Sequence, residues 1–179
     1  MSKRIRLWLI AALALCAAAA VGVTLSFMFK KAEKTNTFVP AEVTCKVEES
    51  LFSGVKSNVC VKNTGNAAAY LRIRLVSYYV YDNGEIAGRV SSQYPALTLR
   101  NGWIAGADHT YYYPTPVEPG EKTEILCDPI TLGTVELADG KTVYQVLEVF
   151  AEAIQAEPVR AVQEAWNVTV SGTKITPAS

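Results

Sequence analysis

Histidine is nearly absent from this sequence, which carries a single one, His109, among its 179 residues. One imidazole cannot build a His-Glu-x-x-His zinc helix, a facial triad or any metal site with two histidine ligands. The sequence also lacks a Cys-x-x-Cys pair, a P-loop, a Gly-x-Gly-x-x-Gly fingerprint and a Gly-x-Ser-x-Gly elbow. We therefore expect no catalytic residue, metal ligand or cofactor, and we interpret His109, in a polar stretch, as a solvated loop residue.

Net charge is absent as well, because 17 basic and 17 acidic side chains cancel. The balance conceals an uneven distribution, since residues 1–31 contain five basic side chains and no acidic one. Removing those five leaves 12 basic against 17 acidic groups, a net charge of −5 for the rest of the chain. This main part has no excess of basic residues, so we expect no nucleic-acid partner.

An uncharged, largely apolar run of 23 residues, 7–29, follows Lys3, Arg4 and Arg6. A basic start before an apolar run is typical of a signal peptide, and this run is also long enough to span about 30 Å of hydrocarbon. We therefore predict an apolar helix within residues 1–31, which is either a cleaved signal peptide or a retained membrane anchor. Both alternatives place the rest of the chain outside the cell, with the membrane and a signal peptidase as partners during export.

Residues 32–41 are polar and are predicted to form a linker or flexible arm. Thr35, Thr37, Phe38 and Val39 suit an extended conformation, and cleavage of the leader would release them. An extended segment can add as a strand to the open sheet edge of a neighbouring copy, and we expect Phe38 to be its anchor. The alternative is a tether that only holds the domain away from the membrane.

After the arm, side chains alternate with the period of two that is typical of β-strands. Strands are predicted at residues 42–47, 58–62, 70–81, 111–113, 121–126, 142–155 and 168–170. Pro158 is predicted to open the one helix, with Val159, Val162 and Trp166 on its buried face. Many short strands and one short C-terminal helix favour an all-β antiparallel sandwich over residues 42–171, followed by a polar tail at residues 172–179.

The two longest predicted strands carry the clearest alternation. In the first, Leu71, Ile73 and Leu75 are expected on one face, with Arg72 and Arg74 on the other. In the second, one face is apolar and comprises Leu147, Val149, Ala151 and Ala153. Its other face alternates Glu148 and Glu152 with Tyr144, Val146, Phe150 and Ile154, which we interpret as a solvent-facing side rather than a catalytic carboxylate pair.

Turns are predicted at residues 63–66 and 82–84 and at Pro119-Gly120, because Asn and Gly tolerate a positive φ. Three cysteines, Cys45, Cys60 and Cys127, follow the leader. An exported chain permits a disulfide, and Cys45 and Cys60 lie on two candidate neighbouring strands that a bridge could join. The alternative is that all three are small buried hydrophobic residues.

Tyrosine is abundant, with nine residues that include one cluster at residues 78–81 and another at residues 111–113. Tyrosine combines apolar area with a polar hydroxyl, which suits partner surfaces. Tyr78, Tyr81, Tyr111 and Tyr113 are therefore a candidate interaction surface. The alternative is that these residues reflect β-propensity alone.

Several segments together resemble a known family. They are the leader, Thr35–Pro40 with Glu42–Val47, Val61–Asn66 leading into Tyr70–Arg74, Pro119–Thr123, and Ala151–Ala156 leading to Ala165-Trp166. In this order the set resembles the SipW-dependent exported proteins of the TasA/camelysin (CalY) group of Gram-positive bacteria. The resemblance implies a jelly-roll-like β-sandwich, export through a dedicated signal peptidase, and a place in biofilm-matrix fibres. Camelysin-type members are described as metalloproteases, so the resemblance also implies that activity. No residues of this sequence match a metal site for it.

From these observations we expect an exported, non-catalytic structural or interaction protein of the cell surface or biofilm matrix of a Gram-positive bacterium. Its expected partner is itself or a related matrix protein, and it would stay membrane-anchored if the leader were retained. Two alternatives remain at this point. One is a camelysin-like cell-surface peptidase, and the other is a surface module that binds a ligand or glycan through its tyrosines.

Overall fold

The computed structural model describes residues 40–100 and 102–178, and the chain from Ala41 onward forms one compact unit. The predicted signal or anchor segment lies outside the described residues. So do the arm residues Thr35, Thr37, Phe38 and Val39. Within the described part of the chain, no helix is long and apolar enough to cross a membrane.

One sheet has three strands in the order β1-β2-β6. β1 (Cys45–Phe52) and β2 (Val55–Asn63) form an antiparallel hairpin, and β6 (Ile130–Thr131) pairs with the start of β2. The hairpin turns at Ser53 and Gly54, which both have left-handed backbone conformations with φ of 48° and 72°. β1 is therefore an edge strand.

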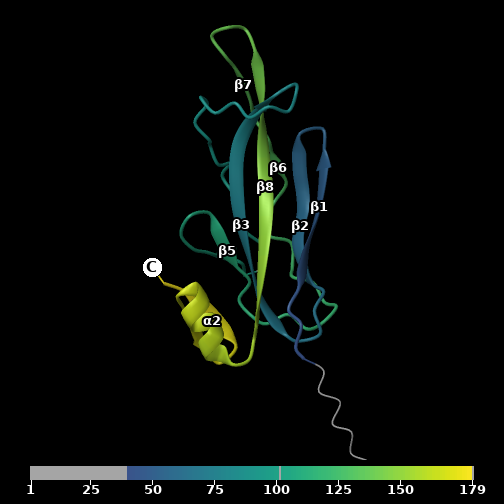
Figure 1. Cartoon of the computed structure of the whole chain (residues 1–179), viewed down its shortest axis with the longest axis vertical. Helices are drawn as coiled ribbons and strands as arrows, with labels where there is room; N and C mark the ends of the chain where they lie inside the picture. The colour runs from purple at the N-terminus through teal and green to yellow at the C-terminus, as the bar shows by residue number, and fades with distance from the viewer. Residues whose placement is uncertain (1–39, 101, 179) are drawn as a thin grey trace, which may run out of the picture. The chain divides into compact units, whose positions relative to one another are not determined.

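The second sheet has five strands in the order β4-β5-β3-β8-β7. Its centre is the antiparallel pair β3 (Ala69–Tyr81) and β8 (Thr142–Gln155), which runs without interruption from Ala69 opposite Gln155 to Tyr81 opposite Val143 (Figure 1). The three short strands β4, β5 and β7 flank this pair and span Ile104–Ala105, Thr110–Tyr112 and Thr134–Glu136. The two longest strands of the fold are thus the two that the alternation pattern predicts.

The main hydrophobic core lies between the two sheets. Val59 and Val61 of β2 pack there with Leu71, Ile73, Leu75 and Leu147 of β3 and β8, and each of these side chains is at most 2% exposed. These are the inward faces that the period-two pattern predicts, because alternate residues of a strand point to opposite faces. The predicted all-β antiparallel sandwich is confirmed.

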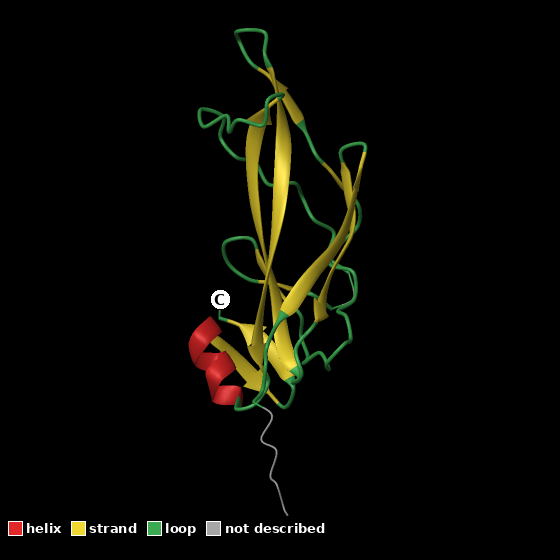
Figure 2. Ribbon diagram, turned by 45° about the vertical axis from the view of Figure 1, so that its right-hand side comes forward, coloured by secondary structure: helices red, strands yellow, loops and turns green. Residues whose placement is uncertain are grey.

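The outer face of the five-stranded sheet is covered at one end only. Helix α2 (Val159–Trp166) and the hairpin of β9 (Val168–Ser171) and β10 (Lys174–Pro177) pack there (Figure 2). Val162, Trp166 and Ile175 form a second apolar cluster with Tyr70 of β3 and Tyr112 of β5. The predicted helix is confirmed, including its buried Val162 and Trp166.

The tail prediction is wrong. Residues 174–177 form β10, and Ile175 is only 1% exposed because it belongs to the cluster beneath α2. The sandwich domain therefore extends past residue 171. A single apolar residue between polar neighbours was too weak a signal to reveal this strand.

The strand predicted at residues 121–126 is not formed either. Thr123 and Leu126 are buried and their N–H groups donate to the carbonyl oxygens of Val61 and Val59, both at 2.8 Å. Between these bonds, however, the N–H of Val61 donates to the Thr123 hydroxyl oxygen rather than to a backbone carbonyl. Residues 121–126 therefore show buried side chains at some alternate positions, but they lack the continuous backbone hydrogen bonds of a strand.

Candidate functional site

The edge of β8 that faces away from β3 is open over most of its length. β7 pairs only with residues 142–144, and the N–H of Gln145 donates to the carbonyl of Gly133 at 2.8 Å. From Val146 to Gln155, no described strand pairs with this side of β8. Such an edge presents a row of backbone donors and acceptors that can accept another strand.

The β3 register identifies which backbone groups of β8 face this open edge. The N–H of Leu75 donates to the carbonyl of His109, on the side of β3 opposite to β8. Because both backbone groups of a strand residue point the same way, Leu75 and its partner Val149 form a non-hydrogen-bonded pair. The N–H and C=O of Val149 therefore point to the open edge, as do those of Leu147 and Ala151.

A cleft of about 480 Å³ lies between the β1–β2 hairpin and this part of β8. Glu49, Leu51, Lys56 and Leu132 line it together with residues 145–150 of β8. Alternate residues of a strand point to opposite faces, so six consecutive residues can all line a cleft only when the cleft follows the edge of the strand. The cleft thus follows the open backbone edge from Val146 to Phe150.

An ion pair between a buried lysine and a more exposed glutamate lies in this cleft. Lys56 is 5% exposed and its Nζ lies 2.6 Å from Oε1 of Glu49. Lys56 faces inward because the strand alternation is interrupted just after it. Asn58 adopts a left-handed conformation and the β1–β2 register shifts between Glu48 and Ser50, so residues nearer the turn point to the opposite face from the one that alternation would give. At the same end Leu51 is 61% exposed, which gives the cleft an apolar rim.

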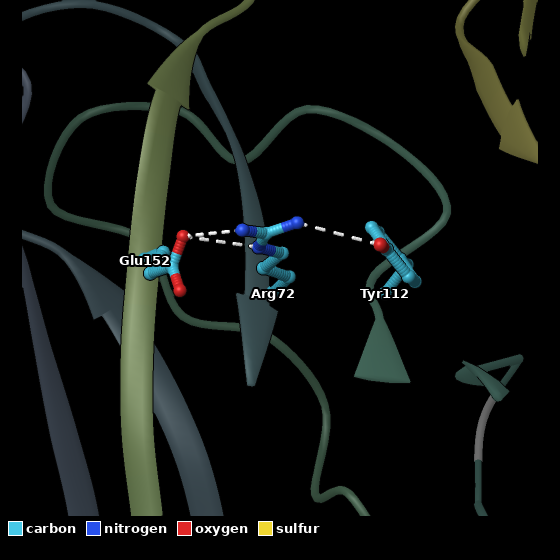
Figure 3. A network of polar contacts seen from close by, with 3 residues as sticks. All are labelled: Arg72, Tyr112 and Glu152. Atoms are coloured by element: carbon cyan, nitrogen blue, oxygen red, sulfur yellow. Dashed lines mark hydrogen bonds and ion pairs between the residues drawn. The ribbon is translucent and has the colours of Figure 1, made fainter. Parts of the chain in front are cut away.

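A second polar network, formed by Arg72, Tyr112 and Glu152, lies on the outer face of the five-stranded sheet (Figure 3). Arg72 donates from Nε and Nη2 to Oε2 of Glu152, at 3.1 and 2.6 Å, and from Nη1 to the Tyr112 hydroxyl at 3.4 Å. The guanidinium carbon also lies 4.7 Å from the ring centroid of Trp166 in α2. Each of the three guanidinium nitrogens donates a hydrogen bond within the fold, so this network acts as a structural link between β3, β8 and α2.

The predicted tyrosine surface is wrong as a unit, because its members face in different directions. Tyr111 and Tyr113 pack against the main core, and Tyr113 meets the Trp103 ring edge-on at 5.3 Å between centroids. Tyr81 packs in a separate apolar cluster, on the face of β3 opposite to Tyr78. Only Tyr78 lies on the outer face of the sheet.

Two exposed aromatic residues share that outer face with Tyr78. Tyr144 is 42% exposed and Phe150 is 45% exposed, and both belong to the side of β8 that was predicted to face solvent. The alternation of side chains in residues 142–155 had placed both Tyr144 and Phe150 on that side. That prediction holds for Glu148 and Phe150, whereas the end of the same face near Ile154 is covered by the α2 cluster.

The candidate bridge between Cys45 and Cys60 is not formed, and both are free thiols, as is Cys127. In the hairpin register Cys45 lies opposite Asn63, whereas Cys60 lies opposite Glu48. The two cysteines are therefore three positions out of register and point to opposite faces of the hairpin, which a disulfide cannot span. Burial is the main cause that raises the pKa of all three thiols above the ordinary value of 9.0.

His109 is an exposed loop residue, as predicted. It adopts a left-handed conformation, φ 55°, and its ring stacks on Tyr94 with 3.4 Å between centroids. Among residues 40–100 and 102–178, no three or more His, Cys, Asp or Glu side chains come together in an arrangement that could hold a metal ion. The features of the described domain that could bind a partner are therefore the open edge of β8, the cleft beside it and the exposed aromatic side chains.

Comparison of the chain with protein-family models, with curated proteins and with solved structures gives no match. Its function is therefore inferred from its own residues.

Proposed function

We propose that this protein is an exported, non-catalytic structural protein of the cell surface or biofilm matrix of a Gram-positive bacterium, related to the TasA/camelysin group. It assembles with copies of itself or with a related matrix protein. The observation that carries this proposal is the open edge of β8 beside the cleft, from Val146 to Gln155. A strand of 14 residues with one long edge open is unusual in a free domain, because native sandwiches generally cover or shorten their edges.

The occupant of this edge is the arm of a neighbouring copy. The arm would bind there as an added strand, with the backbone of Thr35, Thr37, Phe38 and Val39 pairing with Leu147, Val149 and Ala151. Phe38 is suited to the apolar rim that Leu51 and Leu132 give to the cleft. Because the arm and the edge are different surfaces, each copy can accept one neighbour and donate to the next, which produces a filament rather than a closed dimer.

Export precedes this assembly, since the arm is released only when a signal peptidase removes the leader. We expect protein recovered from the cell surface to begin between about residue 21 and residue 35, which N-terminal sequencing determines. A chain that still begins at Met1 would show a retained membrane anchor. In that case the arm would have no free end to donate.

A proline at the open edge tests the site of assembly. Val149→Pro removes one N–H from the open edge of β8 but leaves the β3 ladder complete, since that N–H does not bond to β3. The matched control, Val149→Ala, shortens the side chain and keeps the N–H. We expect surface-recovered protein with Val149→Ala to form filaments by electron microscopy and light scattering, and protein with Val149→Pro to remain monomeric.

Folding of the proline variant is checked by circular dichroism and thermal unfolding, and Ala151→Pro provides a second variant with the same backbone effect. A chain that begins at Ala41 tests the donor side, and we expect it to form no filaments. Filaments from a folded Val149→Pro variant would contradict assembly at this edge. Filaments from the chain that begins at Ala41 would contradict the role of the arm.

A further inference from the structure

A buried ammonium group lies in the cleft that we propose as the binding site for the arm of a neighbouring copy. The side chain of Lys56 is 6% exposed, and its Nζ donates to Oε1 of Glu49 at 2.6 Å. Within residues 40–100 and 102–178, this is the one hydrogen bond that the ammonium makes. An ammonium carries three N–H donors, so two of them are left for other acceptors.

The other polar side chains along the cleft are engaged elsewhere. Oε1 of Gln145 accepts from the N–H of Gly133 at 2.9 Å, and Glu148 accepts from the Tyr78 hydroxyl at 2.7 Å. The remaining side chains that line the cleft are apolar: Leu51, Leu132, Val146, Leu147, Val149 and Phe150. At about 480 Å³ the cleft has room for water molecules that can accept from the ammonium, and a strand that enters displaces them. An incoming strand must therefore supply the acceptors itself.

Irregularities of the β1–β2 hairpin turn both members of the ion pair into the cleft. Glu49 lies within the register shift of the hairpin, and Lys56 lies two residues before Asn58, whose φ is 56°. Regular alternation from the buried Val59 would instead point Lys56 to the outer face. Bulges that re-aim a side chain in this way are frequent next to functional sites.

Stability does not account for a lysine at this place. Moving an ammonium out of water costs free energy that one partner seldom returns, and an apolar side chain of similar length is often at least as stable. A task in binding does account for it. A buried polar group in an otherwise apolar interface selects the partner, because a partner without a matching group leaves it unpaired.

We propose that Lys56 is the specificity-determining residue of the cleft, which admits a strand with side-chain oxygens and rejects an apolar one. The occupant is the arm of a second copy, so this inference rests on the proposed function. Thr35, Asn36 and Thr37 give the arm three consecutive side chains that carry an oxygen. Alternate side chains of a strand point to opposite faces, so either Asn36 or the two threonines would face the ammonium.

This selection protects an edge that would otherwise accept many strands. An open strand edge beside apolar side chains is a common route to aggregation, above all with apolar β-forming segments. Such a segment in this cleft would leave two N–H donors of Lys56 without water and without an acceptor, which lowers its affinity. The arm restores both hydrogen bonds, so the cleft favours it over unrelated strands.

A double-mutant cycle in the full chain tests this role. The cleft variant is Lys56→Met, and the arm variant combines Thr35→Val, Asn36→Leu and Thr37→Val, which remove the oxygens and keep the side chains similar in size. Light scattering of the surface-recovered protein gives the critical concentration for filament formation, and electron microscopy confirms the filaments. We expect the apolar arm to raise the critical concentration about tenfold beside Lys56, and to have no such effect beside Lys56→Met.

The matched control is Lys141→Met, which makes the same chemical change outside the cleft. The Lys141 side chain is 66% exposed and lies 3.6 Å from Asp139 in the turn between β7 and β8. In this background the apolar arm should still raise the critical concentration about tenfold. Circular dichroism and thermal unfolding verify that each cleft variant is folded.

A second set of variants supplies a charge instead of removing one. Glu49→Gln takes away the carboxylate that Lys56 uses, and an arm with Asn36→Asp or Thr37→Asp would bring one back. We expect one of these two arms to lower the critical concentration of the Glu49→Gln protein about tenfold. With Glu49 present the same arm should bring no gain, because the ammonium already has its counter-charge.

The outcomes separate this inference from the proposed function. If the apolar arm raised the critical concentration equally beside Lys56 and beside Lys56→Met, or had no effect beside Lys56, the selective role of the lysine would be overturned while assembly at the β8 edge would stand. A Glu49→Gln protein that gains from neither aspartate arm would also overturn it. If the unchanged protein formed no filaments, the proposed function would fail, and this inference with it.

Discussion

Arg72 and Glu152 lie directly opposite each other across the β3–β8 ladder, and Nη2 of the arginine is 2.6 Å from Oε2 of the glutamate. The same guanidinium lies over the Trp166 ring of α2. One side chain thus joins the two longest strands to the helix that covers their outer face. Arg74, two residues further along the same face, has no such contacts and is exposed to solvent.

This difference between the two arginines gives a prediction for stability. We expect Arg72→Ala to lower the free energy of unfolding by about 1–2 kcal/mol, since it removes a partly exposed ion pair and a cation–π contact. Arg74→Ala should change it by less than about 0.5 kcal/mol, as is usual for an exposed residue without partners. Urea unfolding followed by circular dichroism measures both, and equal effects would show that the link to α2 contributes nothing.

Gly65 lies in a turn where the backbone of another segment approaches closely. A Cβ added at this position would lie 2.2 Å from the carbonyl oxygen of Glu42. Gly65→Ala should therefore lower the free energy of unfolding by about 1–3 kcal/mol through overpacking. Gly88→Ala is the matched control, because nothing lies within 4 Å of its added Cβ, and we expect it to be neutral or slightly stabilising.

The turn at Gly65 shows what a sequence pattern can and cannot predict. The turn itself was predicted from Asn and Gly, but the reason given, a positive φ, is wrong for Gly65, which is not among the residues with positive φ. What requires glycine is the approach of Glu42, more than twenty residues away in the chain. Local patterns carry no information on such tertiary contacts.

Because local patterns do not report tertiary contacts, the sequence predicted some parts of the candidate sites and missed others. Alternation correctly gave the inward faces of β3 and β8, because long strands repeat the pattern many times. It could not orient Tyr111, in a strand of only three residues, Thr110–Tyr112, or Tyr113, which follows that strand. Nor could it reveal the hairpin register that separates Cys45 from Cys60. The open edge of β8 was expected only in general terms, since its position depends on where β7 stops pairing.

The three free thiols give a pH-dependent prediction. Burial raises the pKa of Cys45, Cys60 and Cys127, so the folded state favours the protonated thiol. This contribution to stability is complete below the ordinary pKa of 9.0 and is lost as the pH rises through the higher pKa of the folded state. We expect the free energy of unfolding to fall above about pH 9 for this reason.

Alkylation measures the same property residue by residue. At pH 8 few of the thiols are ionised, so iodoacetamide should react slowly with all three in the folded protein. Cys127, which is only 4% exposed, should react last. Peptide mapping by mass spectrometry identifies each site, and a peptide pair linked through Cys45 and Cys60 would contradict the register of the hairpin.

The ion pair in the cleft gives the last prediction, which depends on which partner is removed. Glu49→Gln leaves the ammonium of Lys56 buried without its counter-charge, and we expect the free energy of unfolding to fall by about 1–3 kcal/mol. Lys56→Met removes the buried charge itself and leaves Glu49, whose side chain is 32% exposed, to be solvated. Replacing a buried charge with an apolar side chain of similar length is often neutral or stabilising, so we expect no loss with Lys56→Met.

An exposed ion pair provides the control for this asymmetry. Lys141 and Asp139 lie 3.6 Å apart with side chains 66% and 56% exposed, so Asp139→Asn should change stability by less than about 0.5 kcal/mol. Urea unfolding of the three variants at pH 7 measures the differences. If Lys56→Met destabilised the protein as much as Glu49→Gln, the ion pair would be a net source of stability. If only Glu49→Gln lowered the free energy of unfolding, the ion pair would add no net stability. Glu49 would then serve to compensate the buried charge of Lys56.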